Sequence, residues 1–181
     1  MSSTLDPRFY YLHNFRKALA WIGDRHADLL DAREQAFLHL FDALDWSAQA
    51  LLVRMIMRKG AHFRASKLNY EEIGCCRQAA AALIANGWVL DDAALSLDEL
   101  LALLRKDEIV VSFAAQLSDR RARKDDLAQQ LAEHFQVSQP FAAWCPGLDD
   151  MLYSLTIDDL SERLRLMFFG NCLLYTSPSP R

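Results

Sequence analysis

Adjacent carboxylates are the first candidates for chemistry in this sequence. Such pairs include Glu71-Glu72, Asp149-Asp150 and Asp158-Asp159. Two neighbouring carboxylates can hold a divalent metal ion or divide the acid and base roles of a hydrolysis between them. Helix N-termini and solvated loops carry such pairs more often, and we interpret all three in that way. A hydrolase that uses Asp149 and Asp150 is kept as an alternative.

The motifs that usually mark an active site do not occur in the sequence. It contains no G-x-G-x-x-G, P-loop, G-x-S-x-G or H-E-x-x-H pattern. None of the five histidines lies three or four residues from another histidine or a cysteine, the spacing typical of a zinc site. The four cysteines lack the spacing of a disulfide framework, which indicates reduced thiols in a cytoplasmic protein.

Basic residues are concentrated in two stretches, although the chain as a whole has 20 basic and 24 acidic residues. Residues 46–70 carry five bases and no acid, and residues 105–124 carry six bases and three acids. Such local patches on small helical modules are typical of DNA-backbone binding, and a solvated helix face is the alternative. The predicted DNA-binding residues are Arg54, Arg58, Lys59, Arg64, Lys67, Lys106, Arg120, Arg121, Arg123 and Lys124.

Overall composition excludes several other partners. A net charge of −4 provides no global attraction to nucleic acid or to acidic membranes. No window approaches the 18 apolar residues that a membrane span needs, and charges among the first residues exclude a signal peptide. We therefore expect a cytoplasmic protein without a membrane partner.

Periodic apolar residues and cap signals predict the elements that position the first basic stretch. Helices are predicted over 9–29, 32–44 and 47–59, the second with Asp31 and Glu34 as a capping box and the third followed by a left-handed Gly60. A short strand within 62–68, a helix over 71–85 and a strand over 88–90 follow. This order predicts a winged-helix-like module over residues 1–95.

The second basic stretch falls in a different helical unit. Ser96 and Glu99 form a capping box for a helix that begins near residue 96, and two short helices follow over about 106–117 and 123–135. The segment QVSQPFAAWCPG, 136–147, is predicted to be a packed loop, and a last helix begins at Thr156. The protein is thus predicted to be mostly α-helical.

Five segments resemble bacterial members of the Fanconi-associated nuclease family. They are LLVRMIMRKGAHFR (51–64), LNYEEIG (68–74), NGWV (86–89), FAAWCPGLDD (141–150) and RLRLMFFGN (163–171). The resemblance extends in order over about residues 8–171. It implies a metal-dependent, structure-selective DNA nuclease of the phosphodiesterase I type, acting on 5′ flaps and in interstrand-crosslink repair.

The resemblance also implies how such a chain is organised. A winged-helix module (1–95) is followed by a SAP-like DNA-binding motif (96–136) and the start of a helical linker region (137–171). The SAP-like pattern maps onto Leu104, Lys106, Glu108 and Ile109 in one helix and onto Arg123, Lys124, Leu127 and Leu131 in the next. The turn between these helices lacks the usual glycine.

The nuclease module of the family is implied to hold Mg²⁺ or Mn²⁺ through an acidic residue and an acid-x-Lys triplet. The positions two residues before the five lysines are Phe15, Met57, Ala65, Leu104 and Ala122. None is acidic, so we expect no metal cofactor and no cleavage by this chain alone. Residues 172–181, CLLYTSPSPR, are interpreted as an artefactual tail, and a genuine proline-containing terminus is the alternative.

These observations predict a protein that binds branched or flap DNA through backbone contacts, for a nuclease module that this chain does not contain. A helical protein-interaction module without DNA binding is a further alternative. Its contact surfaces would be the acidic stretch 71–104 and the apolar residues 164–169.

Overall fold

The computed structural model describes residues 6–175, and for residues 168–175 only the backbone. The chain is mostly helical and divides into two compact units. Of the described residues, the first unit contains 6–61, 69–89 and 155–175, and the second contains 62–68 and 90–154. The backbone of residues 172–175 continues the last helix, which ends at Tyr175. The rest of the segment interpreted as a tail, 176–181, lies outside the described residues.

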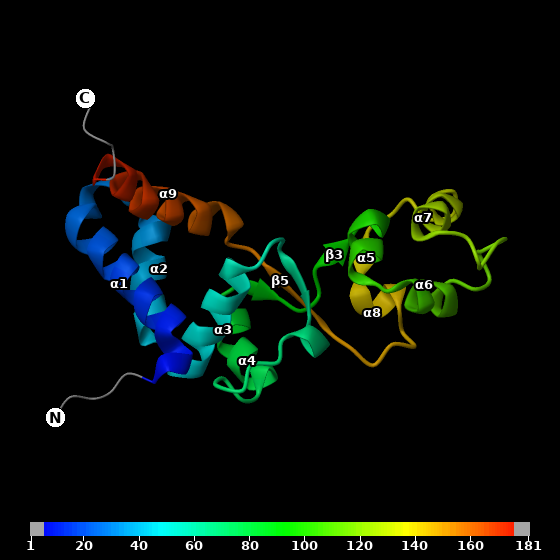
Figure 1. Cartoon of the computed structure of the whole chain (residues 1–181), viewed down its shortest axis with the longest axis horizontal. Helices are drawn as coiled ribbons and strands as arrows, with labels where there is room; N and C mark the ends of the chain where they lie inside the picture. Colours follow the sequence, from blue (N-terminus) through cyan, green and yellow to red (C-terminus); the bar gives the residue numbers. More distant parts are fainter. Residues whose placement is uncertain (1–5, 176–181) are drawn as a thin grey trace. The chain divides into compact units, whose positions relative to one another are not determined.

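Figure 1 shows the helices of the first unit, of which the first packs against the second, the third and the last, while the fourth packs against the third. The unit contains α1 (Tyr10–Arg25), α2 (Ala32–Ala43), α3 (Trp46–Met57), α4 (Cys76–Ala85) and α9 (Asp158–Tyr175), with the short 3-10 segments Pro7–Phe9 and Ala27–Leu29. Apolar side chains at helical spacing, such as Leu12, Phe37 and Leu51, are fully buried between them. Arg163 on α9 forms an ion pair with the buried Glu34 on α2, at 2.7 Å.

The predicted cap residues form the expected contacts. Asp31 and Glu34 make both bonds of a capping box at the start of α2, and Gly60 has a positive φ of 85°. Gly87 ends α4 with a φ of 75°, while the Gly87 and Trp88 N–H groups donate to the carbonyls of Ile84 and Leu83. This is a Schellman arrangement, in which a left-handed residue lets the chain satisfy the last carbonyls of the helix.

The fourth helix begins later than predicted. The sequence predicts a helix from residue 71, whereas α4 begins at Cys76. Residues 71–73 form a turn that ends at Gly74, with φ of 75°. A left-handed residue cannot continue a right-handed helix, so the helix starts only after Gly74.

Two short sheets join segments that are distant in sequence. The first has the strand order β1-β5-β2, from His62–Arg64, Leu152–Leu155 and Val89–Leu90. β1 and β5 pair antiparallel, with Phe63 opposite Tyr153. The strands predicted near 62–68 and 88–90 are confirmed, but β5 has no counterpart among the predicted elements. Its four residues are all buried, and they complete the sheet.

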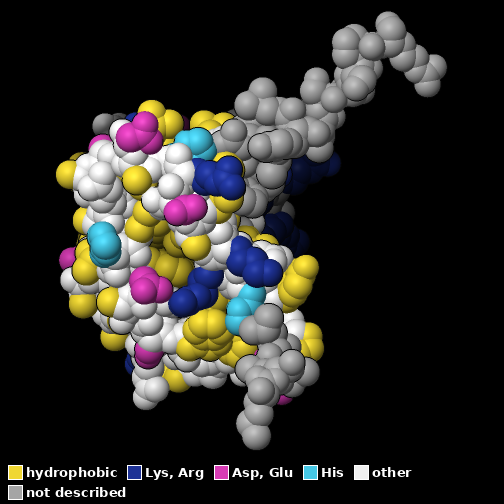
Figure 2. Space-filling view, turned by 90° about the vertical axis from the view of Figure 1, so that its left-hand side faces the viewer, with side chains coloured by type: hydrophobic (Ala, Val, Ile, Leu, Met, Phe, Trp, Pro, Cys, Tyr) yellow, Lys and Arg dark blue, Asp and Glu magenta, His cyan; other side chains and the backbone are white. Residues whose placement is uncertain are grey.

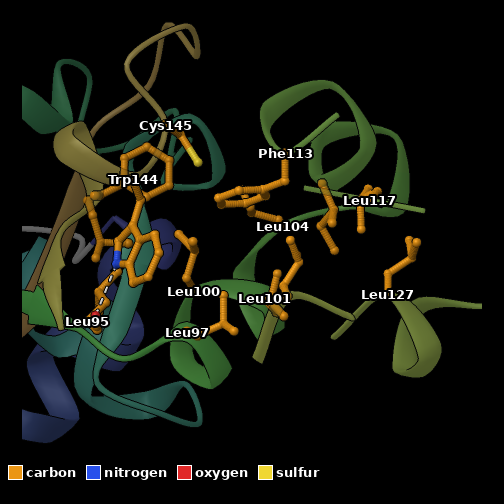
Figure 3. Packing of buried hydrophobic residues seen from close by; sticks show 14 residues of the cluster. Leu95, Leu97, Leu100, Leu101, Leu104, Phe113, Leu117, Leu127, Trp144 and Cys145 are labelled. Atoms are coloured by element: carbon orange, nitrogen blue, oxygen red, sulfur yellow. Dashed lines mark hydrogen bonds between the residues drawn. The ribbon is translucent and has the colours of Figure 1, made fainter. Parts of the chain in front are cut away.

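The second unit has its own hydrophobic core. It contains α5 (Leu97–Leu103), α6 (Lys106–Ser112), α7 (Lys124–Ala132) and α8 (Phe141–Trp144), with the 3-10 segment Ala65–Lys67. β3 (Ala94–Leu95) pairs antiparallel with β4 (Gln139–Pro140). Figure 3 shows Leu97, Leu100 and Leu101 of α5 close to Leu104, Phe113 and Trp144. Trp144 Nε1 donates to the Leu95 carbonyl at 3.0 Å, which anchors α8 beside β3.

The unit boundary differs from the predicted end of the SAP-like motif at residue 136. Phe141, Trp144, Cys145 and Leu152 belong to the same core as the helices of that motif. The segment predicted to be a packed loop therefore contains β4 and α8, and its Phe141, Trp144 and Cys145 are buried in the core of the second unit. Among the described residues, no helix is long and apolar enough to span a membrane.

Candidate nucleic-acid interface

Five of the ten predicted residues gather at one end of the second unit. Residues 118–124 connect α6 to α7 and are called the basic turn; the side chains of Arg120, Arg121 and Arg123 on it are exposed. Lys106, at the start of α6, reaches the turn and donates to the Arg121 carbonyl at 3.1 Å. Lys124 donates to the Leu104 carbonyl at the end of α5, at 2.7 Å.

These contacts divide the five cations by role. The two ammonium groups satisfy main-chain carbonyls and tie the basic turn to the helices around it. Arg120 also makes one contact, to the Ala114 carbonyl at 3.2 Å, while its side chain stays exposed. The three arginines thus present planar, permanently charged groups to solvent, and such groups suit phosphate recognition. Asp125 and Asp126 in the first turn of α7 reduce the local positive charge and complement the helix dipole.

Arg64 is placed differently from a surface cation, because only 8% of its side chain is exposed. It donates to Glu108 on α6 at 2.7 and 2.9 Å and to Asp150 at 2.8 Å. Ser66 donates to the same Asp150 from both its N–H and its hydroxyl. The network joins β1, α6 and the segment before β5, and it assigns Arg64 a structural role.

The carboxyl groups of this network are held ionised. Hydrogen bonds from Arg64 lower the pKa of Glu108 below its ordinary value. Burial acts to raise the pKa of Asp150, but the hydrogen bonds from Ser66, from the Met151 N–H and from Arg64 outweigh it, so the pKa is lowered.

Arg54, in the first unit, also contacts residues of its own unit. Its guanidinium lies over the Tyr11 ring, 4.0 Å from the centroid, and 4.8 Å from that of Tyr70. It donates to Glu72 at 2.6 Å, and Tyr11 donates to the same carboxylate at 3.0 Å. Burial raises the pKa of Tyr11 to about 12. The cation–π contacts and the ion pair hold the turn that precedes α4 against α1 and α3.

The remaining predicted cations are exposed but dispersed. Arg58 and Lys59 follow α3 in the first unit, and Lys67 ends the 3-10 segment after β1 in the second. The structure therefore supports a cluster only at the basic turn.

The carboxylate pairs do not form a metal site. Asp150 and Glu72 bind Arg64 and Arg54, and Asp159 binds Arg33 at 2.7 Å. Among the side chains that the structure describes, residues 6–167, no three groups of the metal-binding types come together.

The first unit also has a hollow beside α1. A pocket of about 600 Å³ lies between α1 and α2, with Leu19, Leu38 and Phe41 among its apolar lining. In Figure 2, which views the side of the molecule that carries α1, hydrophobic side chains form the floor of a hollow with Lys and Arg side chains beside it. None of the ten predicted residues lines this pocket.

Sequence reasoning did not identify Gln130, which receives three hydrogen bonds from the basic turn. No sequence pattern distinguishes a glutamine that binds a turn from any other glutamine on a polar helix face. The missing glycine was the sequence feature that pointed to such a residue, because a turn without a left-handed residue must be held by other contacts.

Comparisons with known proteins agree with this architecture. Residues 9–90 match the family described as FAN1, HTH domain, and residues 94–144 match the Fanconi anemia-associated nuclease SAP domain. The second match extends past residue 136 to the end of α8, and the shared core extends further, to Leu152. The fold thus combines a helix-turn-helix domain with a SAP domain. This combination places the chain in the class of helical DNA-binding proteins.

Relatives and solved structures specify the family. A Fanconi-associated nuclease 1 homolog from Pseudomonas aeruginosa is 48% identical over 94% of this chain, which spans 30% of that relative's length. A homolog from Arabidopsis thaliana is 31% identical over 131 residues, 67% of this chain and 14% of the relative. A crystal structure of paFAN1 bound to a 2-nucleotide 5′ flap DNA with a gap superposes with a TM-score of 0.89 at 48% identity, over 93% of this chain and 31% of that one. A second, with a 1-nucleotide flap, has a TM-score of 0.87, covering 91% of this chain and 30% of that one. The chain belongs to the Fanconi-associated nuclease family and corresponds to the N-terminal region of its members.

Proposed function

We propose that this chain is the DNA-binding N-terminal part of a structure-selective DNA repair nuclease, and that it binds branched or 5′-flap duplexes through phosphate contacts. The observation that carries the proposal is the cluster of exposed arginines on the basic turn, in a chain whose fold matches paFAN1 structures that contain 5′ flap DNA. Contacts of this kind position a duplex without reading its sequence.

Cleavage is proposed to belong to the part of the relatives that this chain does not match. That part would hold Mg²⁺ or Mn²⁺ and hydrolyse the phosphodiester bond. The described residues of this chain contribute no metal cluster, so its own contribution is to bind and orient the DNA. We further propose that the protein acts in the bacterial cytoplasm.

The proposal is tested by the salt dependence of DNA binding. We expect the purified chain to bind a fluorescent 5′-flap duplex with an affinity that falls steeply with salt, because each neutralised phosphate releases counterions. Replacing Arg120, Arg121 and Arg123 with Ala should weaken binding at low salt. It should also reduce the slope of log K against log salt by about 0.9 for each phosphate that the variant no longer neutralises.

A matched variant distinguishes the effect of the basic turn on DNA binding from the effect of net charge. Replacing Lys17, Arg25 and Arg77, three exposed cations of the first unit, with Ala removes the same charge and should leave the slope close to that of the native chain. Equal effects of the two triple variants, or binding that salt does not change, would contradict the proposed role of the turn. Undetectable binding would favour a protein-interaction module, and Mg²⁺-dependent flap cleavage by this chain would favour a hydrolase.

A further inference from the structure

The basic turn is held in shape by one side chain of the following helix. Gln130 Oε1 accepts hydrogen bonds from the Ser118 N–H at 2.9 Å, the Ser118 hydroxyl at 3.1 Å and the Asp119 N–H at 3.1 Å. Its Nε2 donates back to the Asp119 carbonyl at 3.3 Å. One amide group thus satisfies the main chain at the residues that lead into the three arginines.

Two further contacts continue the same frame. Asp119 Oδ1 accepts the Arg121 N–H at 2.9 Å, and Lys106 donates to the Arg121 carbonyl at 3.1 Å. No non-glycine residue between 6 and 175 has a positive φ, so the turn needs no left-handed residue. Side-chain hydrogen bonds replace the glycine that is usual in this kind of motif.

A fixed turn changes what DNA binding costs. Ordering the backbone of one residue costs about 1–2 kcal/mol of conformational entropy. If residues 118–121 were free before binding, their ordering would reduce the binding free energy that the three arginines provide. A turn that is already ordered carries no such cost, which is the general advantage of preorganisation.

The position of Gln130 separates this effect from core stability. Leu127 and Leu131 anchor α7 in the core and are fully buried, whereas Gln130 is half-buried on the side of α7 that faces the turn. Loss of its amide group should therefore loosen the turn without creating a cavity in the core.

We propose that Gln130 is a positioning residue for DNA binding: it preorders the basic turn so that Arg120, Arg121 and Arg123 meet phosphates together. The inference rests on the proposed function and adds a residue that contacts no DNA itself.

The test compares Gln130→Met with Gln129→Met on the same helix. Methionine keeps the length of the side chain but removes its polar atoms, and Gln129 is exposed. We expect Gln130→Met to bind the flap duplex about tenfold more weakly, the equivalent of ordering about one residue. The salt slope should stay that of the native chain, because the cost of ordering the turn does not change the number of phosphates neutralised in the complex. Gln129→Met should match the native chain.

Hydrogen exchange of the free protein provides the second readout. The Ser118 and Asp119 amides should be protected in the native chain, exposed to exchange in Gln130→Met, and protected again in Gln130→Glu, which keeps the acceptor oxygens. A general loss of folding in Gln130→Met would instead expose amides throughout α5, α6 and α7 to exchange, and that outcome would overturn the positioning role.

The outcomes distinguish the two proposals. A native chain that binds flap DNA, together with an unchanged affinity in Gln130→Met, overturns the positioning role alone. Unprotected amides in the native chain overturn it as well. A native chain that does not bind DNA overturns the proposed function and the positioning role with it.

Discussion

Individual cations of this chain differ chiefly in the acceptors that surround them. Arg54 and Arg64 were both predicted to meet DNA, yet each donates to carboxylates inside its own unit. Arg121 and Arg123 carry the same charge on an exposed turn. The type of residue was therefore insufficient to predict its role, because burial beside an acid decides whether a guanidinium is available to a partner.

Removing Arg64 should destabilise the second unit strongly. Arg64→Met leaves Glu108 and Asp150 buried without their shared partner, which typically costs about 3–5 kcal/mol of unfolding free energy. The measurement is urea unfolding followed by tryptophan fluorescence. Arg105→Met is the control, because that side chain is 66% exposed, and its ion pairs with Asp107 and, at 3.8 Å, with Glu108 should contribute less than about 1 kcal/mol. Similar losses in both variants would refute a structural role for Arg64.

Acid should weaken the same network. The pKa values of Glu108 and Asp150 lie below their ordinary values of 4.5 and 3.8, so the folded state binds fewer protons than the unfolded state. Their stabilisation is therefore complete above about pH 5 and is lost as the pH falls through the lowered values. Unfolding free energy measured from pH 6 to pH 3 should decrease, and the decrease should be shallower in Arg64→Met. A parallel decrease in both proteins would exclude the network as the cause.

At the scale of elements, the ends of helices carried the most reliable sequence signals. The capping boxes at Asp31 and Ser96 are both confirmed, as is the end of α4 at Asn86-Gly87. These motifs involve residues at most five positions apart, so they can be recognised without knowledge of the fold. The start of α4 was missed because Gly74 interrupts an otherwise helical pattern.

Gly87 offers a test of one such signal. A Cβ at this position meets no neighbouring atom within 4 Å, so Gly87→Ala should act only through its left-handed backbone, at about 1–2 kcal/mol of unfolding free energy. Gly147→Ala has equally open surroundings without a left-handed φ, and its thermal unfolding should match the native chain or slightly exceed it. Indistinguishable melting of the two variants would show that the helix end tolerates a side chain.

At the scale of the molecule, both units are assembled from separate stretches of the chain. Residues 62–68 join 90–154, and residues 155–175 join a unit that begins at the N-terminus. Boundaries drawn as consecutive segments, such as 1–95 and 96–136, could not represent this arrangement.

Trp144 tests whether α8 belongs to the SAP core. The indole contacts Phe113 and Phe135 and is almost fully buried, so Trp144→Ala should cost about 3–5 kcal/mol of unfolding free energy. Val137→Ala, at a side chain that is 80% exposed between α7 and α8, should change it by less than about 0.5 kcal/mol. Chemical denaturation monitored by circular dichroism measures both. A cost near that of Val137→Ala would mean that the motif closes at residue 136.

The sequence by itself determined the helical class, the cap residues, the family resemblance and the lack of an acid-x-Lys triplet, because each depends on residues close together in the chain. Only the tertiary structure decided that β5 pairs with β1, that Arg64 lies between Glu108 and Asp150, and that Gln130 holds the basic turn. Asp150 lies 86 positions from Arg64, and Gln130 lies 12 from Ser118. A hydrogen bond across such separations leaves no local pattern, since it forms only when the fold brings donor and acceptor together.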